Sequence, residues 1–480
     1  MRLSELLREV EFEGSIKNDF DIKFVTDDSR LVRPGALFVC IRHRSFDGHT
    51  AAAEALASGA AAVVTQERLG LENELNVVDS RAAYARLCAA LCGHPERKLR
   101  MIGVTGTNGK TTVTTLIRNI LSDSGIKTLL TGTVCNRLGE ESLPSGLTTP
   151  KPPELYSLLS RAVLSGCEAC VAEASSQALA QGRLEGIAFD AAVFTNITRD
   201  HLDYHGTFEN YLAAKKKLFE HSEVSAVNLD DPRADEIIAA SSGKTVTFST
   251  VLDCADYTAK NISLLPEGVS FELVSKGRIE HINFASPGLF SVSNAMAAAV
   301  CAINLGVDPR SAAQSLARSK GVCGRLERVE CGTPYSVIID YAHTPDGLEQ
   351  VLRALRPSCR GKLIVLFGCG GDRDKTKRPL MGAAACKYAD TVIVTSDNPR
   401  SEEPMKIIGD ILKGTDKKRR GLFIEEDRRR ATALALSLAK PGDTVLLAGK
   451  GHEKYQLICG EKLPLDERET VREILGLPHD

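Results

Sequence analysis

Residues that could bind a phosphate group lie close together near residue 105. The sequence over residues 103–112 reads GVTGTNGKTT, between an apolar run predicted as a strand and a predicted helix over 111–122. The two glycines permit a tight turn whose backbone N–H groups and following helix N-terminus face an anion. Lys110 can reach the β- and γ-phosphates of a nucleotide, and a threonine hydroxyl can bind Mg²⁺. The spacing GxxGKT is shorter than the common GxxxxGK[ST], and the order of elements favours a phosphate loop over an ordinary glycine turn.

Two motifs further along the chain offer candidate metal ligands. Glu173 closes a predicted strand in ACVAEASSQ, where a phosphate-loop domain usually carries a second Mg²⁺ anchor, although a solvated glutamate is the alternative. His201 and His205 bracket Asp203 in TRDHLDYHG. This HxDxH spacing could bind zinc, but the neighbouring nucleotide site favours a phosphate-handling role. Each histidine alone could equally be a structural hydrogen-bonding group.

A helix is predicted around the lysines of NYLAAKKKLF. Successive residues of a helix rotate by about 100°, so Lys215 and the two lysines after it face different directions. The pattern alone predicts that Lys215 is a surface lysine.

The last third of the chain carries polar loops after apolar segments. His343 lies in DYAHTPDG, where the Thr-Pro pair disfavours a helix, so it is expected on a loop. The stretch GCGGDRDKTKRP combines flexible glycines with basic residues that suit anionic groups. In SDNPRSEEP, Asp397 and Arg400 are expected on one turn, where they could bind the ammonium and a carboxylate of an amino acid. A local Asp–Arg turn without a ligand is the alternative.

Composition narrows the class of protein. The 480 residues are 43% hydrophobic and have a net charge of −2, which disfavours a nucleic-acid binder. No run of 18 apolar residues predicts a membrane span, and the charged N-terminus is not that of a signal peptide. The 14 cysteines lie mostly in apolar contexts and suit reduced thiols in a cytosolic protein. Cys167 and Cys170 form one CxxC without a second pair, so core packing is favoured over zinc or redox chemistry.

The elements that must position these residues fall into three segments. The first is a small α/β domain with predicted strands over 36–41, 60–65 and 76–78 and a helix over 50–58, followed by a polar linker over 94–100. The second begins with the phosphate loop and contains strands over 169–173, 191–196 and 225–228, antiparallel strands within 257–284 and a helix over 291–305.

The third segment alternates predicted strands with helices, which is typical of a doubly wound, mostly parallel sheet. Its strands are expected over 336–340, 362–367, 391–395, 422–425 and 444–448. FGCGGDRD, SDNPR and AGKGHE follow three of these strands. Ligands of such sheets bind at the carboxyl ends of the strands.

Taken together, these motifs resemble the Mur ligases, and most closely their MurE type, along the whole chain. The resemblance rests on TGTNGKTT, EASSQ, TNITRDHLDYHG, YLAAKK, GRLE, DYAHTPD, FGCGGDRDKTKRPLMG, SDNPRSEEP and AGKGHE in this order. Members of the family join an amino acid to a UDP-N-acetylmuramoyl peptide at the expense of ATP. The resemblance implies an N-terminal UDP-sugar-binding domain (1–97), a central P-loop ATPase-like domain (98–325) and a C-terminal Rossmann-like domain that binds the amino acid (326–480).

The resemblance also implies roles on the ATP side. Catalytic roles fall to Lys110, Glu173, His201 and Lys215. ATP contacts fall to Gly106, Thr107, Asn108, Gly109, Lys110, Thr111, Thr112, Asn294, Arg325 and His343. Mg²⁺ is held by Thr111, Glu173, His201 and Lys215. The family carbamylates the lysine at position 215 with CO₂, which turns an ammonium into a carboxylate that can bind metal and reverses the prediction from pattern alone.

The remaining matches concern the other two substrates. Those for the UDP-N-acetylmuramoyl dipeptide are Ser29, Thr148, Thr149, Ser175, Gln181 and Arg183, with a further segment at 44–46 that reads RSF where the family more often has HQA. Those for the amino acid are Arg373, Asp397, Asn398, Pro399, Arg400, Gly449 and Glu453. The DNPR form resembles ligases that add meso-diaminopimelate, whose second carboxylate suits Arg400, whereas lysine-adding relatives usually lack this arginine.

The implied reaction is ligation through an acyl phosphate in peptidoglycan precursor synthesis, and hence in cell-wall growth, cell shape and division. The resemblance implies a cytoplasmic monomer that acts on small molecules, without nucleic acid or membrane span. The alternatives are the same reaction with L-lysine, a folylpoly-γ-glutamate synthetase-like ligase, and a non-catalytic nucleotide switch. The N-terminal domain and the DNPR loop argue against the synthetase, and the Glu, His and Lys set exceeds what a switch needs.

Overall fold

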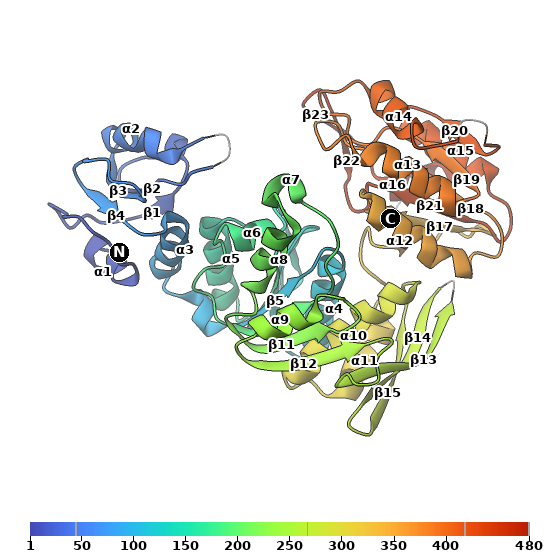
Figure 1. Ribbon diagram of the computed structural model, residues 1–480, viewed down its shortest axis with the longest axis horizontal. Helices are drawn as coiled ribbons and strands as arrows, with labels where there is room; N and C mark the ends of the chain where they lie inside the picture. Colours follow the sequence, from blue (N-terminus) through green and yellow to red (C-terminus); the bar gives the residue numbers. More distant parts are fainter. Residues whose placement is uncertain (44–45, 266, 417–418, 479–480) are drawn as a thin grey trace. The chain divides into compact units, whose positions relative to one another are not determined.

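A computed structural model describes residues 1–43, 46–265, 267–416 and 419–478 (Figure 1). The chain forms two compact units. The first comprises Met1–Phe248 with Val300–Val307, and the second comprises Ser249–Ala299 with Asp308–Asp480. Among the described residues, no helix has the length and apolar character needed to cross a membrane.

The first unit begins with a small parallel sheet. Its four strands lie in the order β1 (Phe24–Thr26), β2 (Ala36–Val39), β3 (Ala60–Thr65) and β4 (Glu74–Asn76). Every residue of β2 and β3 is buried because helices cover both faces: α2 (Ala52–Ala57) packs on one, and α3 (Ser80–Leu91) with α1 (Leu3–Leu6) packs on the other. The strand predicted over 76–78 is displaced, since β4 ends at Asn76 and Val78 is 92% exposed. The helix predicted over 50–58 starts as a 3₁₀ turn (Gly48–Ala51).

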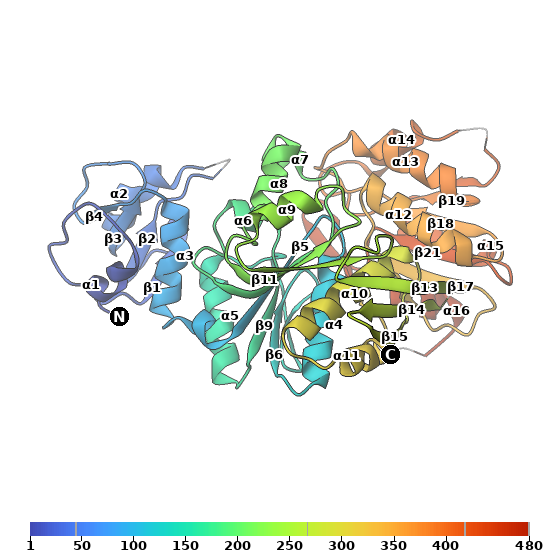
Figure 2. The ribbon, with the colours of Figure 1, turned by 60° about the horizontal axis from the view of Figure 1, so that its bottom comes forward.

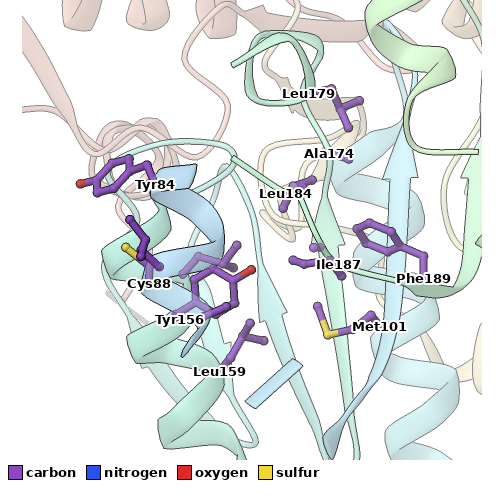
Figure 3. Close-up of a cluster of buried hydrophobic side chains, with 14 of the residues drawn as sticks. Tyr84, Cys88, Met101, Tyr156, Leu159, Ala174, Leu179, Leu184, Ile187 and Phe189 are labelled. Atoms are coloured by element: carbon purple, nitrogen blue, oxygen red, sulfur yellow. The ribbon is translucent and has the colours of Figure 1, made fainter. Parts of the chain in front are cut away.

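The expected polar linker over 94–100 is instead part of the fold. Residues Pro95–Lys98 form a 3₁₀ helix in which Pro95 and Glu96 are buried. One apolar core continues across this turn: Tyr84 and Cys88 of α3 belong to the same buried cluster as Tyr156 and Leu159 of α5 (Pro152–Leu164) (Figure 3). The linker prediction failed because α3 and α5 share an apolar core, and the polar sequence over 94–100 is packed beside that core.

The phosphate-loop strand is central in a larger sheet of the first unit. Among the described residues this sheet has 11 strands, of which those in the first unit lie in the order β12 (Lys244–Ser249), β11 (Ser222–Asn228), β10 (Phe189–Phe194), β5 (Arg100–Thr105), β9 (Ala169–Glu173), β6 (Thr128–Thr131), β7 (Asn136–Leu138) and β8 (Glu141–Leu143). Strands β12 to β6 in this order are parallel, and β7 and β8 pair antiparallel. The accompanying helices are α4 (Lys110–Asp123), α6 (Ser176–Ala180), α7 (Leu202–His205), α8 (Phe208–Lys216) and α9 (Ala234–Ala240).

The second unit contains an antiparallel meander and a doubly wound sheet (Figure 2). The meander is β13 (Tyr257–Leu265), β14 (Gly268–Ser275) and β15 (Arg278–Phe284), and it confirms the antiparallel strands expected there. Helices α10 (Leu289–Asn304) and α11 (Pro309–Arg318) follow in the chain.

The doubly wound sheet has six strands in the order β16 (Glu327–Arg328), β17 (Ser336–Asp340), β21 (Thr444–Ala448), β18 (Leu363–Phe367), β19 (Thr391–Val394) and β20 (Leu422–Ile424). All pairs are parallel except β16–β17, which confirms the predicted fold class. Helices α12 (Pro345–Leu355), α13 (Lys377–Tyr388) and α14 (Pro404–Leu412) bury one face. Helices α15 (Arg428–Leu438) and α16 (Glu467–Leu475) bury the other, and a hairpin of β22 (Tyr455–Ile458) and β23 (Glu461–Pro464) follows β21.

Candidate functional site

The predicted phosphate loop joins the end of β5 to the start of α4. A Cβ atom at Gly106 would lie 1.8 Å from Thr195 Oγ1, so a side chain there would require this part of the loop to move. Gly109 precedes α4 with a φ of +88°, the left-handed region that glycine enters without strain. The strand, the turn and the helix N-terminus therefore stand in the arrangement that favours anion binding.

The loop is fastened to the segment after β10. Asn196 accepts hydrogen bonds from the N–H of Thr107 through its carbonyl oxygen (2.8 Å) and from the N–H of Asn108 through Oδ1 (3.0 Å). Lys110 folds back over the turn, where its Nζ donates to the carbonyl oxygens of Gly106 (2.8 Å) and Thr107 (3.0 Å). The ammonium thus lies at the loop, as the sequence predicted.

Glu173 lies at the end of β9, opposite the first turn of α4. Its Oε2 accepts hydrogen bonds from Thr111 Oγ1 (3.1 Å) and Thr133 Oγ1 (2.9 Å), and its Oε1 accepts one from the Thr133 N–H (2.8 Å). The residue is 1% exposed, and a Cβ at Gly132 would lie 2.4 Å from Oε1. The alternative of a solvated glutamate is therefore wrong: this carboxylate is buried beside a hydroxyl of the phosphate loop.

Lys215 contradicts the prediction from helix pattern, because it is only 1% exposed. It lies one turn after Tyr211 on the buried face of α8, and its Nζ is 4.5 Å from the centre of that ring. Within the described ranges, Lys215 forms no ion pair with a carboxylate. Burial, together with the nearby charge of Lys110, holds the pKa of this amine well below its ordinary value. The amine is thus driven toward its neutral form.

The two histidines of the HxDxH motif have different environments. His201 precedes α7 with a φ of +51°, its side chain is 48% exposed, and its Nε2 lies 3.4 Å from Asp200. His205 is buried, with Nε2 3.0 Å from Ser176 Oγ. In the part of the chain that the structure describes, no group of three His, Cys, Asp or Glu side chains could hold a metal ion. The zinc interpretation therefore finds no support in the geometry.

The residues matched to the muramoyl peptide surround the end of β9. Thr149 Oγ1 donates to the Glu173 carbonyl oxygen (2.6 Å) and lies 3.1 Å from Ser175 Oγ. Thr148 Oγ1 lies 3.1 Å from Thr133 Oγ1, the hydroxyl that donates to Glu173. Thr133 therefore links the carboxylate to this group, although it was not singled out in the sequence.

Arg183 completes the same group. Its Nη1 donates to the Thr149 carbonyl oxygen (2.7 Å), and its Nε and Nη2 donate to Gln181 Oε1 at 3.0 and 2.7 Å. Gln181 Nε2 in turn donates to the Tyr204 hydroxyl (3.0 Å). The structure thus brings Thr148, Thr149, Ser175, Gln181 and Arg183 together.

Ser29 lies in a pocket of about 460 Å³ in the first unit. Ser29 lines the pocket together with Asp27, Asp28, Arg30, His43, Phe46 and Lys151. Lys151 Nζ lies 3.1 Å from an Asp27 carboxylate oxygen. Hydrogen bonds from Arg30 lower the pKa of Asp28 to about 2. Of the predicted segment 44–46, Phe46 lines the pocket, whereas Arg44 and Ser45 lie outside the described residues.

In the second unit, the loops after β19 and β21 meet around a buried lysine. Lys450 is 0% exposed, and its Nζ lies 2.5 Å from Asn398 Oδ1 and 3.3 Å from both Asp397 Oδ1 and Glu453 Oε2. Asn398 Nδ2 donates to Glu453 Oε2 (2.9 Å). A Cβ at Gly449 would lie 2.9 Å from Asp397 Oδ2. The predicted residues Asp397, Asn398, Gly449 and Glu453 are therefore neighbours.

The glycine loop after β18 brings two arginines to this region. A Cβ at Gly370 would lie 2.7 Å from Arg400 Nη1 and 3.7 Å from Arg373 Cγ. Arg400 Nη1 donates to the Gly371 carbonyl oxygen (2.7 Å), and the Gly371 N–H donates to the Asn398 carbonyl oxygen (2.9 Å). The turn expected over Asp397 to Arg400 is displaced: the hydrogen-bonded turn runs from Pro399 to Glu402 (3.0 Å), and Arg400, at a φ of +52°, forms a β-bridge with Ile458.

A buried ion pair between α15 and α16 contacts the end of β21, where one of these loops begins. Arg428 at the start of α15 pairs with Glu467 of α16, with both side chains 1% exposed. Arg428 Nη2 also donates to the Ala448 carbonyl oxygen (2.8 Å). Sequence analysis missed Lys450 and Arg428. The AGKGHE motif pointed to Lys450, but nothing distinguishes Arg428 from the surface arginines beside it in RRR.

The other residues matched to ATP also lie in the second unit. The Arg325 guanidinium lies 4.8 Å from the centre of the Tyr341 ring, and His343 packs edge-on against that ring at 4.8 Å. Buried Asp340 accepts hydrogen bonds from the N–H groups of Leu326 and Ala342, both at 2.7 Å. Asn294 is 8% exposed in α10. Arg325 and His343 therefore share one aromatic partner.

Comparison with known proteins agrees with this geometry. Residues 21–90 match the catalytic domain of the Mur ligase family, residues 104–302 match the Mur ligase middle domain, and residues 324–451 match the Mur ligase glutamate ligase domain.

Full-length relatives are similar as well. UDP-N-acetylmuramoyl-L-alanyl-D-glutamate–2,6-diaminopimelate ligases from Caldanaerobacter subterraneus and Syntrophomonas wolfei are 44% and 43% identical, with 99% of each chain covered. A solved structure of a ligase with the same name is 34% identical with a TM-score of 0.73, over 99% of both chains. A Mycobacterium tuberculosis folylpolyglutamate synthase, at 17% identity and a TM-score of 0.63 over 84% of this chain and 96% of its own, shares the fold. The chain therefore belongs to the Mur ligase family.

Proposed function

We propose that this chain is the ligase that joins meso-diaminopimelate to the D-Glu residue of UDP-N-acetylmuramoyl-L-Ala-D-Glu at the expense of ATP. The observation that carries the proposal is the second-unit site, where Asp397, Asn398 and Glu453 lie near two arginines, Arg373 and Arg400. Such a site can bind an ammonium and a carboxylate of one amino acid. The full-length relatives carry the name of the same ligase.

The phosphate loop supports the ATP half of the reaction. The N-terminus of α4 and the Lys110 ammonium are proposed to bind the phosphates, because both favour negative charge. The γ-carboxylate of D-Glu attacks the γ-phosphorus of ATP, forms an acyl phosphate and releases ADP. The diaminopimelate amine then attacks the acyl carbon, forms the amide and releases phosphate and a proton. ATP contacts from Asn294, Arg325 and His343 belong to the same proposal.

The residues around Glu173 suit Mg²⁺. Magnesium takes oxygen ligands, and Thr111 Oγ1 and Glu173 Oε2 lie 3.1 Å apart at the loop. We assign Thr111, Glu173, His201 and the carbamate of Lys215 to metal binding. Bound Mg²⁺ would neutralise part of the charge on the phosphates.

Burial supports the carbamate proposal for Lys215. A neutral amine is the nucleophile that adds to CO₂: its nitrogen bonds to carbon and it loses one proton, leaving an anionic carbamate. Lys215 is buried, its pKa is lowered, and within the described ranges it pairs with no carboxylate. Carbon-13 NMR after incubation with labelled bicarbonate tests this, because wild type should give one carbamate signal that Lys215→Met lacks.

The UDP-sugar dipeptide is assigned to Ser29, with its pocket, and to the five residues around Thr149. The proposed domains are 1–97, 98–325 and 326–480, for the UDP-sugar, ATP and the amino acid respectively. The proposal further places the protein in the cytoplasm as a monomer in peptidoglycan precursor synthesis, where its product supports cell-wall growth and division.

Release of phosphate tests the proposed function. Wild-type protein is incubated with ATP, Mg²⁺, the UDP-sugar dipeptide and meso-diaminopimelate, and each component is then left out in turn. We expect sustained phosphate release only from the complete mixture. Phosphate release that does not depend on the UDP-sugar dipeptide would contradict the proposal.

A further inference from the structure

Lys450 is the most enclosed charged residue of the amino-acid site. It follows β21 and is 0% exposed. Its Nζ lies 2.5 Å from Asn398 Oδ1, 2.8 Å from the Tyr455 carbonyl oxygen and 3.3 Å from Asp397 and Glu453 oxygens. An ammonium has three donors, so these acceptors use all of them. Lys450 therefore has no donor left for a carboxylate of the substrate.

The contacts of Lys450 determine how Asn398 is oriented. Asn398 Oδ1 accepts from Lys450 Nζ and from the Leu457 N–H (2.8 Å), so its Nδ2 faces Glu453 Oε2 at 2.9 Å. Without the Lys450 ammonium, exchanging the positions of Oδ1 and Nδ2 of Asn398 would cost less free energy. Glu453 Oε2 receives hydrogen bonds from both side chains, which fixes the carboxylate in one position.

We propose that Lys450 is a positioning residue: it orients Asn398 and offsets one carboxylate charge, so that Asp397 and Glu453 receive one ammonium group of the incoming amino acid. The charges agree with this role. The Asp397 and Glu453 carboxylates together with the Lys450 ammonium carry a net charge of −1, which matches one ammonium group of the amino-acid substrate. Gly449 leaves space beside Asp397 Oδ2, where a Cβ would come within 2.9 Å. The inference rests on the proposed function.

Titration of Asp397 gives a readout for this role. Burial alone would raise the pKa of the Asp397 carboxyl, but Lys450 and, to a smaller extent, Arg428 hold it below its ordinary value. The charged and titratable groups that face this carboxyl are Lys450, Arg428, His343, Glu453, Glu467, Cys369, Tyr341 and Tyr455. Removing Lys450 leaves the burial in place and removes the largest opposing charge, so the pKa of Asp397 must rise.

The test compares Lys450→Met with Lys454→Met and Lys450→Arg. Lys454 lies four positions along the same segment, and its side chain is 74% exposed. For each variant, kcat/KM for meso-diaminopimelate is measured against pH, together with the KM for ATP and the thermal midpoint.

Lys450→Met should raise the KM for meso-diaminopimelate about tenfold or more, because the two carboxylates lose their fixed positions. It should also move the acid limb of the pH profile to higher pH, because the pKa of Asp397 rises. The KM for ATP should stay within about twofold, because the phosphate loop is untouched. Lys454→Met should match wild type. Lys450→Arg keeps the charge, so its acid limb should stay in place while its KM for meso-diaminopimelate rises.

A folded Lys450→Met enzyme with the wild-type acid limb and KM would overturn the inference. If this variant does not fold, Lys450→Arg decides: a displaced acid limb or a wild-type KM would contradict the proposed role. Failure of the proposed function gives a different result, because wild type itself would then show no turnover with meso-diaminopimelate.

Discussion

Arg400 is predicted to select meso-diaminopimelate over L-lysine. One of its N–H groups donates to the Gly371 carbonyl oxygen (2.7 Å), and the others have no acceptor among the described residues. The guanidinium can therefore form a bidentate pair with the carboxylate that meso-diaminopimelate has and lysine lacks. A charge-assisted pair of this kind contributes about 1.5–3 kcal/mol. At about 1.4 kcal/mol per decade, Arg400→Met should lose roughly 10- to 200-fold in kcat/KM for meso-diaminopimelate.

The structure also supplies the controls. Arg400→Met loses the hydrogen bond to Gly371 as well, worth about 1 kcal/mol, but that loss affects both amino acids alike and cancels in their ratio. Arg400→Lys keeps the charge without the planar fork, so it should recover only part of the preference. Arg400→Gly removes the left-handed strain of a φ of +52°, which offsets the lost hydrogen bond, so its stability should stay close to that of wild type while the preference is lost.

The assay is kcat/KM for meso-diaminopimelate and for L-lysine in wild type and the three variants. The ratio of kcat/KM for meso-diaminopimelate to kcat/KM for L-lysine should fall in the methionine and glycine variants. The KM for ATP should hardly change. An equal loss of kcat/KM for the two amino acids in Arg400→Met would refute the reasoning, because Arg400 would then support the loop and would not bind the distal carboxylate.

Three further predictions concern the phosphate loop, the buried amine and a supporting ion pair. Lys110→Ala should lower kcat by at least about 10²-fold with an unchanged circular dichroism spectrum, since its ammonium lies at the loop and outside the core; near-normal turnover would remove the assignment. Lys215→Met should be nearly inactive yet more stable than wild type at neutral pH in CO₂-free buffer. In the wild type, unfolding lets Lys215 bind a proton that the buried amine resists, which lowers the free energy of unfolding below the unfolded pKa of about 10.4. The excess stability of Lys215→Met, measured by urea unfolding, should therefore shrink as pH rises toward about 10.4, and an excess that does not change with pH would contradict this. Hydrogen bonds from Arg378 hold the pKa of Glu402 at about 2. The ionised Glu402 therefore stabilises the folded protein above pH 4.5, and this contribution is lost as pH falls to about 2. Glu402→Gln should therefore cost about 2 kcal/mol at pH 7, allowing for partial exposure, and almost nothing near pH 2, as measured by urea unfolding.

Much of the fold could be predicted because apolar runs with clear ends set the strands. The strand expected over 336–340 is β17, and that over 444–448 is β21, residue for residue. Such runs are buried on both faces, so hydrophobicity alone locates them. β4 was misplaced because only its central residue is buried, which leaves little apolar signal.

The site was predictable where a motif has its own backbone chemistry, as at the phosphate loop. It was not predictable where burial decides the role. Lys215 resembles its two neighbouring lysines in sequence, and only its position one turn after buried Tyr211 places it inside. Lys450 and Arg428 are buried because they satisfy carbonyl oxygens and carboxylates from distant segments, information that no local window contains.

The most direct test of the central claim is a competition for product. Wild-type protein receives ATP, Mg²⁺, the UDP-sugar dipeptide and equal amounts of meso-diaminopimelate and L-lysine, and mass spectrometry measures the UDP-tripeptides formed. The proposed function predicts that nearly all product contains diaminopimelate. A product dominated by lysine, or no tripeptide from either amino acid, would contradict it.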